Sequence, residues 1–332
     1  MATTVITAFN EFLSEYVNLD STVTTQARAS RNWLLSQIQA LPGNHADFPV
    51  LYPDVDIHYG SFARRTKIRE LDDLDMIVGI SGLGTTYQDY GSIVRLTVPS
   101  GIALRELCHD GTNLLNSRRV INKFVNYLSD ISQYKRSEIK RNGVAAVLNL
   151  TSYTWCFDIV PGFFTAPEFD GRTYYIIPDG NGHWMKTDPR IDQERTTTVN
   201  QLHDGNVLNI IRSIKYWNRR PTMPTMPSYL LESLILNYYA NRTDKASSFV
   251  DLEVGRVLTY LATAVLGSVQ DPKQIQGDIN TLALDARLAI SFRANADTAK
   301  AVEARAAENA KNYELSINLW REVFGPFFPQ YG

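Results

Sequence analysis

The stretch IHYGSFARRTKIRELDDLDMIVGI, residues 57–80, decides the fold. It opens with alternating apolar and polar residues, typical of a half-buried strand, and this strand runs into Gly60-Ser61. It closes with Leu74–Ile80, a run of β-forming residues that predicts a second strand. A short basic segment, which we expect to be helical, lies between them. The stretch therefore predicts two strands connected through a turn and a short helix.

The Gly60-Ser61 turn is a candidate phosphate-binding element. A strand that ends in such a turn exposes backbone N–H groups and a hydroxyl, so an anionic phosphate can approach closely. Taken alone, a Gly-Ser dipeptide is more often an ordinary turn. One of the basic residues after it could serve a phosphate or an acceptor, but a solvated helix face accounts better for most of them: Arg64, Arg65, Lys67 and Arg69.

Asp73 and Asp75 occupy alternate positions at the start of the second strand, so their side chains project from the same face. Two carboxylates this close repel each other, and a divalent cation between them relieves the repulsion. Magnesium is the natural ion for hard oxygen ligands. The competing interpretation is a solvated strand edge. Asp72 precedes the pair, and we favour Asp73 and Asp75 because they keep the alternate spacing.

A third acid, Asp158, lies in the apolar run 153–160, which predicts a strand that ends at Pro161-Gly162. An unpaired buried carboxylate is costly, so Asp158 needs a metal ion, an arginine such as Arg141, or a water-filled cleft. If its strand lies beside the strand with the acidic pair, the three acids form a two-metal site. One ion would then activate a ribose hydroxyl and the other would hold a triphosphate.

The remaining pattern is rich in strands in the first half of the chain and almost wholly helical in the second, which predicts an α+β protein of two lobes. Residues 81–92 have the composition of a mobile loop, and residues 178–182 that of an irregular turn. We expect a strand at 55–59, a hairpin of strands 136–141 and 144–150, and helices at 5–17, 21–41, 112–132, 205–219, 228–242, 249–268 and 278–320.

The composition of the 332 residues is that of an ordinary globular protein, with 44% hydrophobic and 20% charged residues. The formal net charge of -2 argues against a protein that coats long nucleic acids. We expect the two cysteines to be free thiols without a disulfide or zinc site. With no apolar run long enough to span a membrane, we expect a cytoplasmic protein. Neither a GxxxxGK[ST] loop nor a GxGxxG fingerprint occurs, which disfavours the usual kinase and dehydrogenase readings.

Residues 60–75 resemble the signature of the DNA polymerase β-like nucleotidyltransferases. More closely, they are similar to the bacterial cyclic-oligonucleotide synthases related to cyclic GMP-AMP synthase, the CD-NTases of anti-phage systems. Residues 158–163, with the sequence DIVPGF, resemble the third-carboxylate motif of that family. The resemblance covers most of the chain and continues through Pro178-Asp179-Gly180, Trp184, Thr187-Asp188-Pro189, residues 214–218 and residues 228–232.

The resemblance implies catalytic roles for five residues in the first half of the chain. Gly60 and Ser61 would hold the triphosphate of the donor nucleotide. Asp73 and Asp75 would each ligate both metal ions. Asp158 would ligate one ion and help to activate the acceptor hydroxyl.

The resemblance also implies nucleotide contacts in the helical half. Lys215 and Ser228 would contact the outer phosphates of the donor, and Tyr229 would stack on a base, roles that suit a point charge and a flat ring. The competing interpretations are a solvated helix position for Lys215 and a core position for Tyr229. The zinc-binding insertion of the animal DNA sensor has no counterpart here, so activation by double-stranded DNA is not implied.

The fold implied is α+β, a two-lobed polymerase β-like nucleotidyltransferase with a mixed-sheet lobe and a helical lobe. We expect N-terminal helices over residues 1–50 that span both lobes. The catalytic core would then cover residues 51–190. A helical, nucleotide-binding and lid-like lobe would cover residues 191–332.

The activity implied is the joining of ribonucleoside triphosphates into a cyclic di- or trinucleotide messenger, with release of pyrophosphate. Two Mg²⁺ ions would serve as cofactors, with Mn²⁺ as a substitute. We expect a monomer without membrane contact and, from the resemblance, an effector protein that senses the product. The rival hypotheses are a synthase of linear oligonucleotides, a transferase that adds a nucleotide to another molecule, and a nucleotide-binding scaffold without catalysis.

Overall fold

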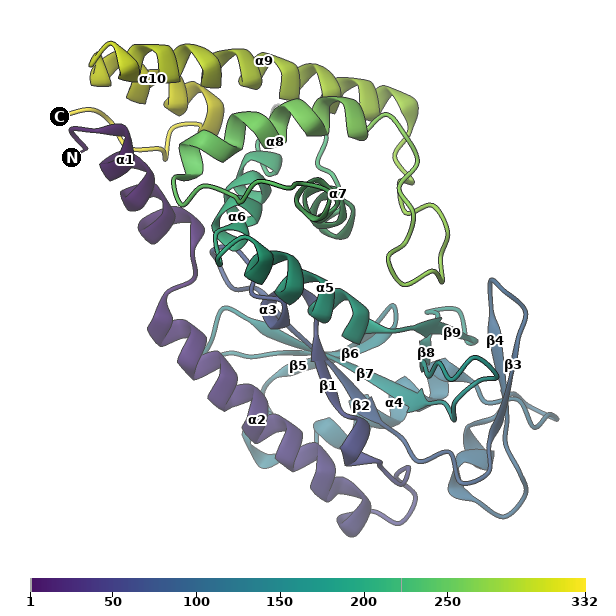
Figure 1. Ribbon diagram of the computed structural model, residues 1–332. Coiled ribbons are helices and arrows are strands. Elements are labelled where there is room, and N and C mark those ends of the chain that lie inside the picture. The colour runs from purple at the N-terminus through teal and green to yellow at the C-terminus, as the bar shows by residue number, and fades with distance from the viewer. Residues whose placement is uncertain (1, 222) are drawn as a thin grey trace. The chain divides into compact units, whose positions relative to one another are not determined.

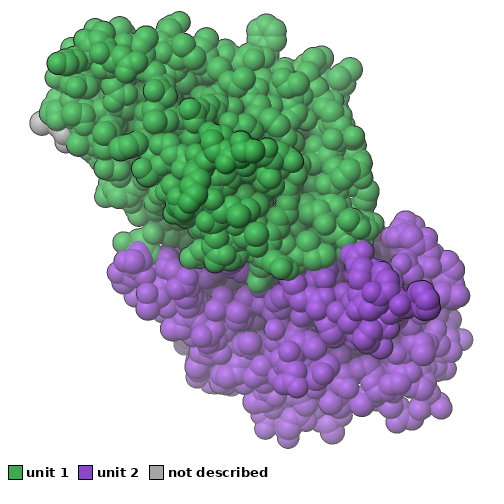
Figure 2. Space-filling model, viewed as in Figure 1, with its two compact units in different colours: residues 1–20, 64–69, 191–332 green, residues 21–63, 70–190 purple. Residues whose placement is uncertain are grey.

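A computed structural model describes residues 2–221 and 223–332 of the chain. These fall into two compact units, coloured separately in Figure 2. We call the first the helical unit, which consists of Met1–Asp20, Arg64–Arg69 and Ile191–Gly332. We call the second the sheet unit, which consists of Ser21–Ala63 and Glu70–Arg190.

The sheet unit is built on a mixed sheet, which within the described residues has nine strands. The main path runs β1-β2-β7-β8-β9-β4-β3, and β6 pairs with both β5 and β7. Strands β2 and β7 are parallel, whereas the other described strand pairs are antiparallel. The strands are β1 Ile57–Tyr59, β2 Asp73–Gly79, β3 Thr86–Asp89, β4 Val94–Thr97, β5 Glu138–Asn142, β6 Ala145–Asn149, β7 Cys156–Phe164, β8 Tyr175–Pro178 and β9 Trp184–Thr187.

Helix α4, Ser117–Leu128, packs against β5, β6, β7 and β8. Its apolar residues recur at helical spacing and are buried, and the side chain of Asn116 accepts hydrogen bonds from the first turn. The sheet unit also contains the long helix α2, Ser21–Asn44, and the single turn α3, Gly60–Ala63. The strand that carries the acidic pair is therefore held in a covered, well-packed sheet.

The helical unit has a large apolar core in which N-terminal and C-terminal aromatic rings meet. Phe9 lies 5.0 Å from both Trp320 and Phe328, measured between ring centroids, with its ring edge-on to theirs. Helix α9 packs against both α8 and α10 (Figure 1). The helices are α1 Val5–Phe12, followed by a π-helical turn at Leu13–Val17, α5 Pro189–Leu202, α6 Val207–Asn218, α7 Ser228–Ala240, α8 Val250–Ala264, α9 Leu284–Asn309 and α10 Tyr313–Phe324.

The predicted α+β class, with a mixed sheet and a helical lobe, is confirmed, and so is the hairpin of β5 and β6. The single helix predicted over 278–320 is wrong. The chain leaves α9 at Asn309, Lys311 adopts a left-handed φ of 62°, and the Asn312 side chain caps α10 by accepting from Leu315. An asparagine cap inside a charged, alanine-rich run therefore marks a helix start that periodicity misses.

Strand β7 does not end at Pro161-Gly162 as predicted, but runs on to Phe164. Its pairing with β6 ends at Ile159 and its pairing with β8 begins at Phe163, so Pro161 lies between these two partners. The missing N–H of the proline consequently costs no ladder hydrogen bond.

Several other boundaries differ from the prediction. The expected loop at 81–92 contains β3, and the basic segment after the Gly-Ser turn is helical only as far as Ala63. Helix α5 was not predicted, α2 continues past Pro42, and Val55 belongs to a 3₁₀ turn rather than to β1. In the described part of the chain, no helix has the length and apolar character needed to cross a bilayer.

Candidate active site

Three carboxylates share one face of the sheet. The parallel register of β2 and β7 pairs Asp75 with Asp158 and Asp73 with Cys156. Residues directly opposite each other on adjacent strands project to the same side, as do residues two apart on one strand. Asp73, Asp75 and Asp158 therefore project to one side of the sheet from strands about 4.8 Å apart. The structure brings together three acids that lie far apart in sequence.

The charge of these acids acts on their neighbours. Tyr59, on β1, is the cross-strand partner of Asp75 on the side away from β7. Burial raises the pKa of the Tyr59 hydroxyl, and the charges of Asp75, Asp158 and Asp73 raise it further. Burial also raises the pKa of the Cys156 thiol to about 11, with Asp158 and Asp73 as the next largest causes. The negative charges of these acids therefore act together on the groups beside this face.

Gly60 is required by the position of Asp75. Its φ of 73° is left-handed, which favours glycine, and a Cβ added there would lie 1.8 Å from Oδ2 of Asp75. The backbone at the start of α3 thus packs directly against the carboxylate. The predicted phosphate turn at Gly60-Ser61 therefore packs against the acidic pair within the sheet unit.

In the helical unit, Lys215 belongs to a buried ionic cluster. Its Nζ lies 2.7 Å from Oε1 of Glu232, and the two side chains are 5% and 2% exposed. Oε2 of Glu232 accepts from Nε of Arg64 at 3.1 Å and from the Thr66 hydroxyl at 2.8 Å. Helix α7 supplies Glu232, α6 supplies Lys215, and the short segment Arg64–Arg69 supplies the rest.

Two cations hold the Glu232 carboxylate ionised. Burial opposes its charge, but Arg64 and Lys215 outweigh that cost, and the pKa of Glu232 is lowered. Burial lowers the pKa of Lys215, with Glu232 acting in the opposite direction. The solvated helix positions that we expected for most of the basic residues are wrong for Arg64 and Lys67, which are both mostly buried, and the solvated alternative for Lys215 is wrong as well.

Ser228 and Tyr229 begin α7, and Ser228 is exposed. The Tyr229 hydroxyl lies 2.9 Å from Asp192 and 3.0 Å from Asp271, and Nζ of Lys273 lies 4.0 Å from the centre of its ring. Burial and the two carboxylates raise the pKa of Tyr229. Tyr229 is therefore neither a plain core residue nor a bare stacking platform, since an ammonium group already lies over its ring.

The sequence interpretation missed Glu232 and Tyr59. A signal for Glu232 existed, because an acid in the apolar run Leu230–Leu236 has to find a cationic partner when it is buried. The single lysine of the apolar helix α6 was a similar signal, since a buried lysine also needs a partner of opposite charge. Nothing in the local sequence of Tyr59 indicated that three acids would surround its hydroxyl, since that depends on the pairing of β1, β2 and β7.

The carboxylate face has the donor atoms for a hard divalent cation. Among residues 2–221 and 223–332, no three His, Cys, Asp or Glu side chains are already gathered as closely as the ligands of one metal ion. Ligation would thus require the carboxylates to turn toward the ion. Two observations support a cation site here: the three carboxylates share one face, and burial and then their charges raise the pKa values of Tyr59 and Cys156.

The chain is similar to known proteins in sequence and in fold. No family model matches the chain. A probable cyclic nucleotide synthase from Bacillus cereus is 44% identical over 334 aligned positions, which cover 100% of this chain and 99% of that protein. A cyclic AMP-AMP-AMP synthase from Escherichia coli is 21% identical over 340 positions, which cover 96% of this chain and 95% of that protein.

A solved structure shares the fold. The Escherichia coli CdnC:HORMA-deltaN complex contains a chain that matches with a TM-score of 0.71 at 18% identity, covering 98% of both chains. A likeness at this identity concerns the arrangement of helices and strands only.

Proposed function

We propose that this chain, which belongs to the family of cyclic nucleotide synthases, joins ribonucleoside triphosphates with the three carboxylates on one face of β2 and β7. The chain is a nucleotidyltransferase with the polymerase β-like fold that its resemblance implied. The observation that carries the site assignment is the register that sets Asp75 opposite Asp158.

The reaction repeats one chemistry, twice for a cyclic dinucleotide and three times for a cyclic trinucleotide. A 2′- or 3′-hydroxyl oxygen of one nucleotide attacks the α-phosphorus of a bound triphosphate. A new P–O bond forms, the bond to the β-phosphate oxygen breaks, and pyrophosphate leaves. Asp158 helps to remove the proton of the hydroxyl. The complete linear intermediate then presents its own triphosphate to its far hydroxyl, and ring closure releases the last pyrophosphate.

Nucleotidyltransferases of this family generally use divalent metal ions. We propose that Asp73 and Asp75 ligate two Mg²⁺ ions, that Asp158 ligates one of them, and that Mn²⁺ can substitute. When bound, such ions neutralise phosphate charge and lower the pKa of an attacking hydroxyl. The carboxylates themselves supply the mutual repulsion that makes cation binding favourable.

The Gly60-Ser61 turn and the helical unit bind the donor nucleotide in this proposal. Gly60 leaves the backbone open beside Asp75, and Ser61 offers its hydroxyl to the triphosphate. Lys215 and Ser228 contact outer phosphates, and Tyr229 stacks on a base with the ring face that Lys273 does not cover. We assign residues 51–190 to the catalytic core, residues 191–332 to the nucleotide-binding, lid-like lobe, and residues 1–50 to helices shared by both.

The substrates and partners follow from the relatives. Because the Escherichia coli relative is named a cyclic AMP-AMP-AMP synthase, we propose that ATP is one substrate and that the product is a cyclic di- or trinucleotide. We further propose that the enzyme acts as a monomer in the cytoplasm, and that an effector protein senses the product in anti-phage signalling.

A product assay tests this function. The purified chain is incubated with MgCl₂ and the four ribonucleoside triphosphates, and the mixture is treated with phosphatase and then a 3′-exonuclease before mass spectrometry. A ring has no end and survives both enzymes. Asp158→Ala should abolish the product, whereas Glu138→Gln, on the exposed strand β5, should leave it unchanged as a matched acidic control.

The assay also separates the rival functions. An oligonucleotide that the exonuclease degrades would identify a linear synthase. Transfer of labelled nucleotide to an added acceptor would identify a group transferase. Calorimetric binding of triphosphate without any turnover would identify a scaffold and reject the proposal.

A further inference from the structure

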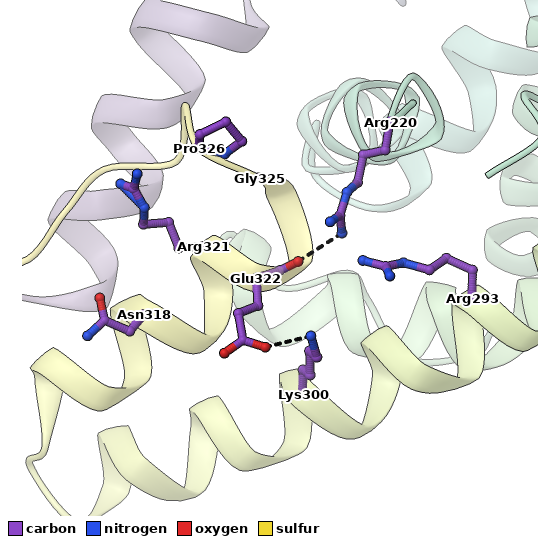
Figure 3. Close-up of a pocket in the computed structure, with 8 residues that line it drawn as sticks. All are labelled: Arg220, Arg293, Lys300, Asn318, Arg321, Glu322, Gly325 and Pro326. Atoms are coloured by element: carbon purple, nitrogen blue, oxygen red, sulfur yellow. Dashed lines mark hydrogen bonds and ion pairs between the residues drawn. The ribbon is translucent and has the colours of Figure 1, made fainter. Parts of the chain in front are cut away.

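The helical unit contains a cationic pocket of about 530 Å³ that includes none of the candidate active-site residues (Figure 3). Arg220 enters it from the segment after α6, Arg293 and Lys300 from α9, and Arg321 and Glu322 from α10. Three separate parts of the chain thus direct charged groups to one hollow.

The pocket has more positive than negative charge. Arg293 donates to Oδ2 of the fully buried Asp297 at 2.7 Å, and the Arg220 guanidinium lies 3.5 Å from the same oxygen. Burial lowers the pKa of Arg220, and the charge of Arg293 is the next cause. The lining contains four cations, Arg220, Arg293, Lys300 and Arg321, and one carboxylate, Glu322. With the buried Asp297 that pairs with Arg220 and Arg293, the net charge is +2.

Some of these cations are fixed and others can exchange partners. Arg220 is held by the backbone carbonyls of Glu322, at 2.8 Å, and Val323 at the end of α10. Lys300 instead pairs with Glu322 at 2.6 Å, with the two side chains 31% and 57% exposed. An exposed pair of this kind contributes about 1 kcal/mol or less, so an entering anion can compete for Lys300.

A second hollow of about 410 Å³ adjoins the first, and the two share Arg220, Gly325 and Pro326 as walls. Its other walls include the rings of Tyr216 and Phe327, and Phe327 is 59% exposed. An exposed aromatic face stacks well on a planar heterocycle. The two hollows together offer cations at one end and aromatic rings at the other.

We propose that these joined hollows bind a nucleotide, with its phosphates beside Arg220, Arg293 and Lys300 and its base against Phe327. A nucleotide combines a polyanion with a flat base, which is the chemistry the two hollows present. Arginine and lysine supply the positive charge, so binding needs no divalent metal. The proposal does not depend on the catalytic assignment, because none of the walls belongs to the candidate active site.

Calorimetric titration of the full chain with ATP and with inorganic tripolyphosphate, both in excess EDTA, tests the site. Lys300→Gln and Arg293→Gln should each weaken both ligands about tenfold. Phe327→Ala should weaken ATP about fivefold or more and leave tripolyphosphate unchanged. Lys140→Gln, an exposed position on β5 of the sheet unit, should change neither. Circular dichroism melting verifies that each variant is folded.

Each outcome decides the proposal. It is overturned if metal-free ATP does not bind, if Lys140→Gln weakens binding as much as the cation variants do, or if neither cation variant weakens it. The nucleotide assignment would be overturned if ATP and tripolyphosphate bound with equal affinity and Phe327→Ala weakened neither. The site would then bind a polyanion without a base. Lys300 is partly exposed, so Lys300→Gln remains informative if Arg293→Gln, which leaves Asp297 with one cation fewer, fails to fold.

Discussion

The two units each contain a set of carboxylates, and the sets are opposite in character. In the sheet unit, Asp73, Asp75 and Asp158 face one another's charge across adjacent strands. In the helical unit, Glu232 is buried between Arg64 and Lys215. The first set gathers three like charges on one face of the sheet, whereas the second places one carboxylate between two cations. We expect the three gathered acids to serve the reaction and the Glu232 carboxylate to serve stability.

The largest expected effect is on catalysis by the three acids of the sheet unit. Asp75→Asn should lower the rate of product formation at least about 10⁴-fold, which corresponds to ~5.4 kcal/mol of transition-state stabilisation. The amide keeps the shape of the carboxylate, so the free energy of unfolding in urea should change far less than the rate. A variant that loses stability and keeps activity within tenfold of the parent would reverse the roles of the two sets.

The next largest effect is on the stability that the buried Glu232 cluster contributes. Glu232→Gln should lower the free energy of unfolding by about 3–5 kcal/mol, because it leaves Arg64 and Lys215 buried without their counter-charge. Asp204→Asn, which alters an exposed pair with Lys245, is the matched control and should cost about 1 kcal/mol or less. Equal urea midpoints for the two variants would show that Glu232 does not hold the cluster together.

A smaller effect separates backbone strain from the clash with Asp75. Gly60→Ala should cost about 2–3 kcal/mol and also reduce activity, because the new Cβ displaces the Asp75 carboxylate. Gly111→Ala has a similar φ of 68° with open space around it, so it should cost about 1 kcal/mol and leave activity unchanged. Product assays and thermal melts of both variants measure the difference. Similar activity in the two would contradict the packing of Gly60 on Asp75.

The smallest effect is a pH dependence within the sheet unit. Burial, and then the charge of Arg31, lowers the pKa of His58 to about 4. The unfolded chain binds a proton near pH 6.5, so this contribution to stability is full above that pH and is lost as pH falls toward 4. After solvent screening it should amount to about 1 kcal/mol. His58→Gln should flatten the pH dependence of urea unfolding over this window, and an unchanged slope would assign it to other groups.

The acidic pair could be predicted from the sequence because the relevant geometry is local. Alternation along one strand places Asp73 and Asp75 on the same side, whatever the rest of the chain does. The placement of Asp158 depends on which strands pair and in which register, and the sequence offered it only through a family resemblance. The turn at Gly60-Ser61 was also predicted, since a strand that runs into Gly-Ser is a local signal, but the left-handed backbone of Gly60 was not.

The ionic cluster could not be predicted, because its members are brought together only by tertiary packing. Arg64 and Glu232 are separated by 168 positions in sequence. Short-range patterns interpret Arg64 as a solvated residue, since nothing near it reveals a buried partner. The burial of Lys215 could not be predicted for the same reason, because it follows from the packing of α6 and α7.

The six residues Arg64–Arg69, which belong to the helical unit although the sheet unit flanks them in sequence, have a practical consequence for dissecting the protein. A gene fragment that encodes residues 191–332 alone would omit Arg64 and Thr66, and Glu232 would then lose two of its hydrogen-bond donors. It would also omit Phe9, whose ring packs on Trp320 and Phe328. We therefore expect a fragment of residues 191–332 to be unstable. A gene that joins residues 1–20 and 64–69 to residues 191–332 should encode a more stable helical unit.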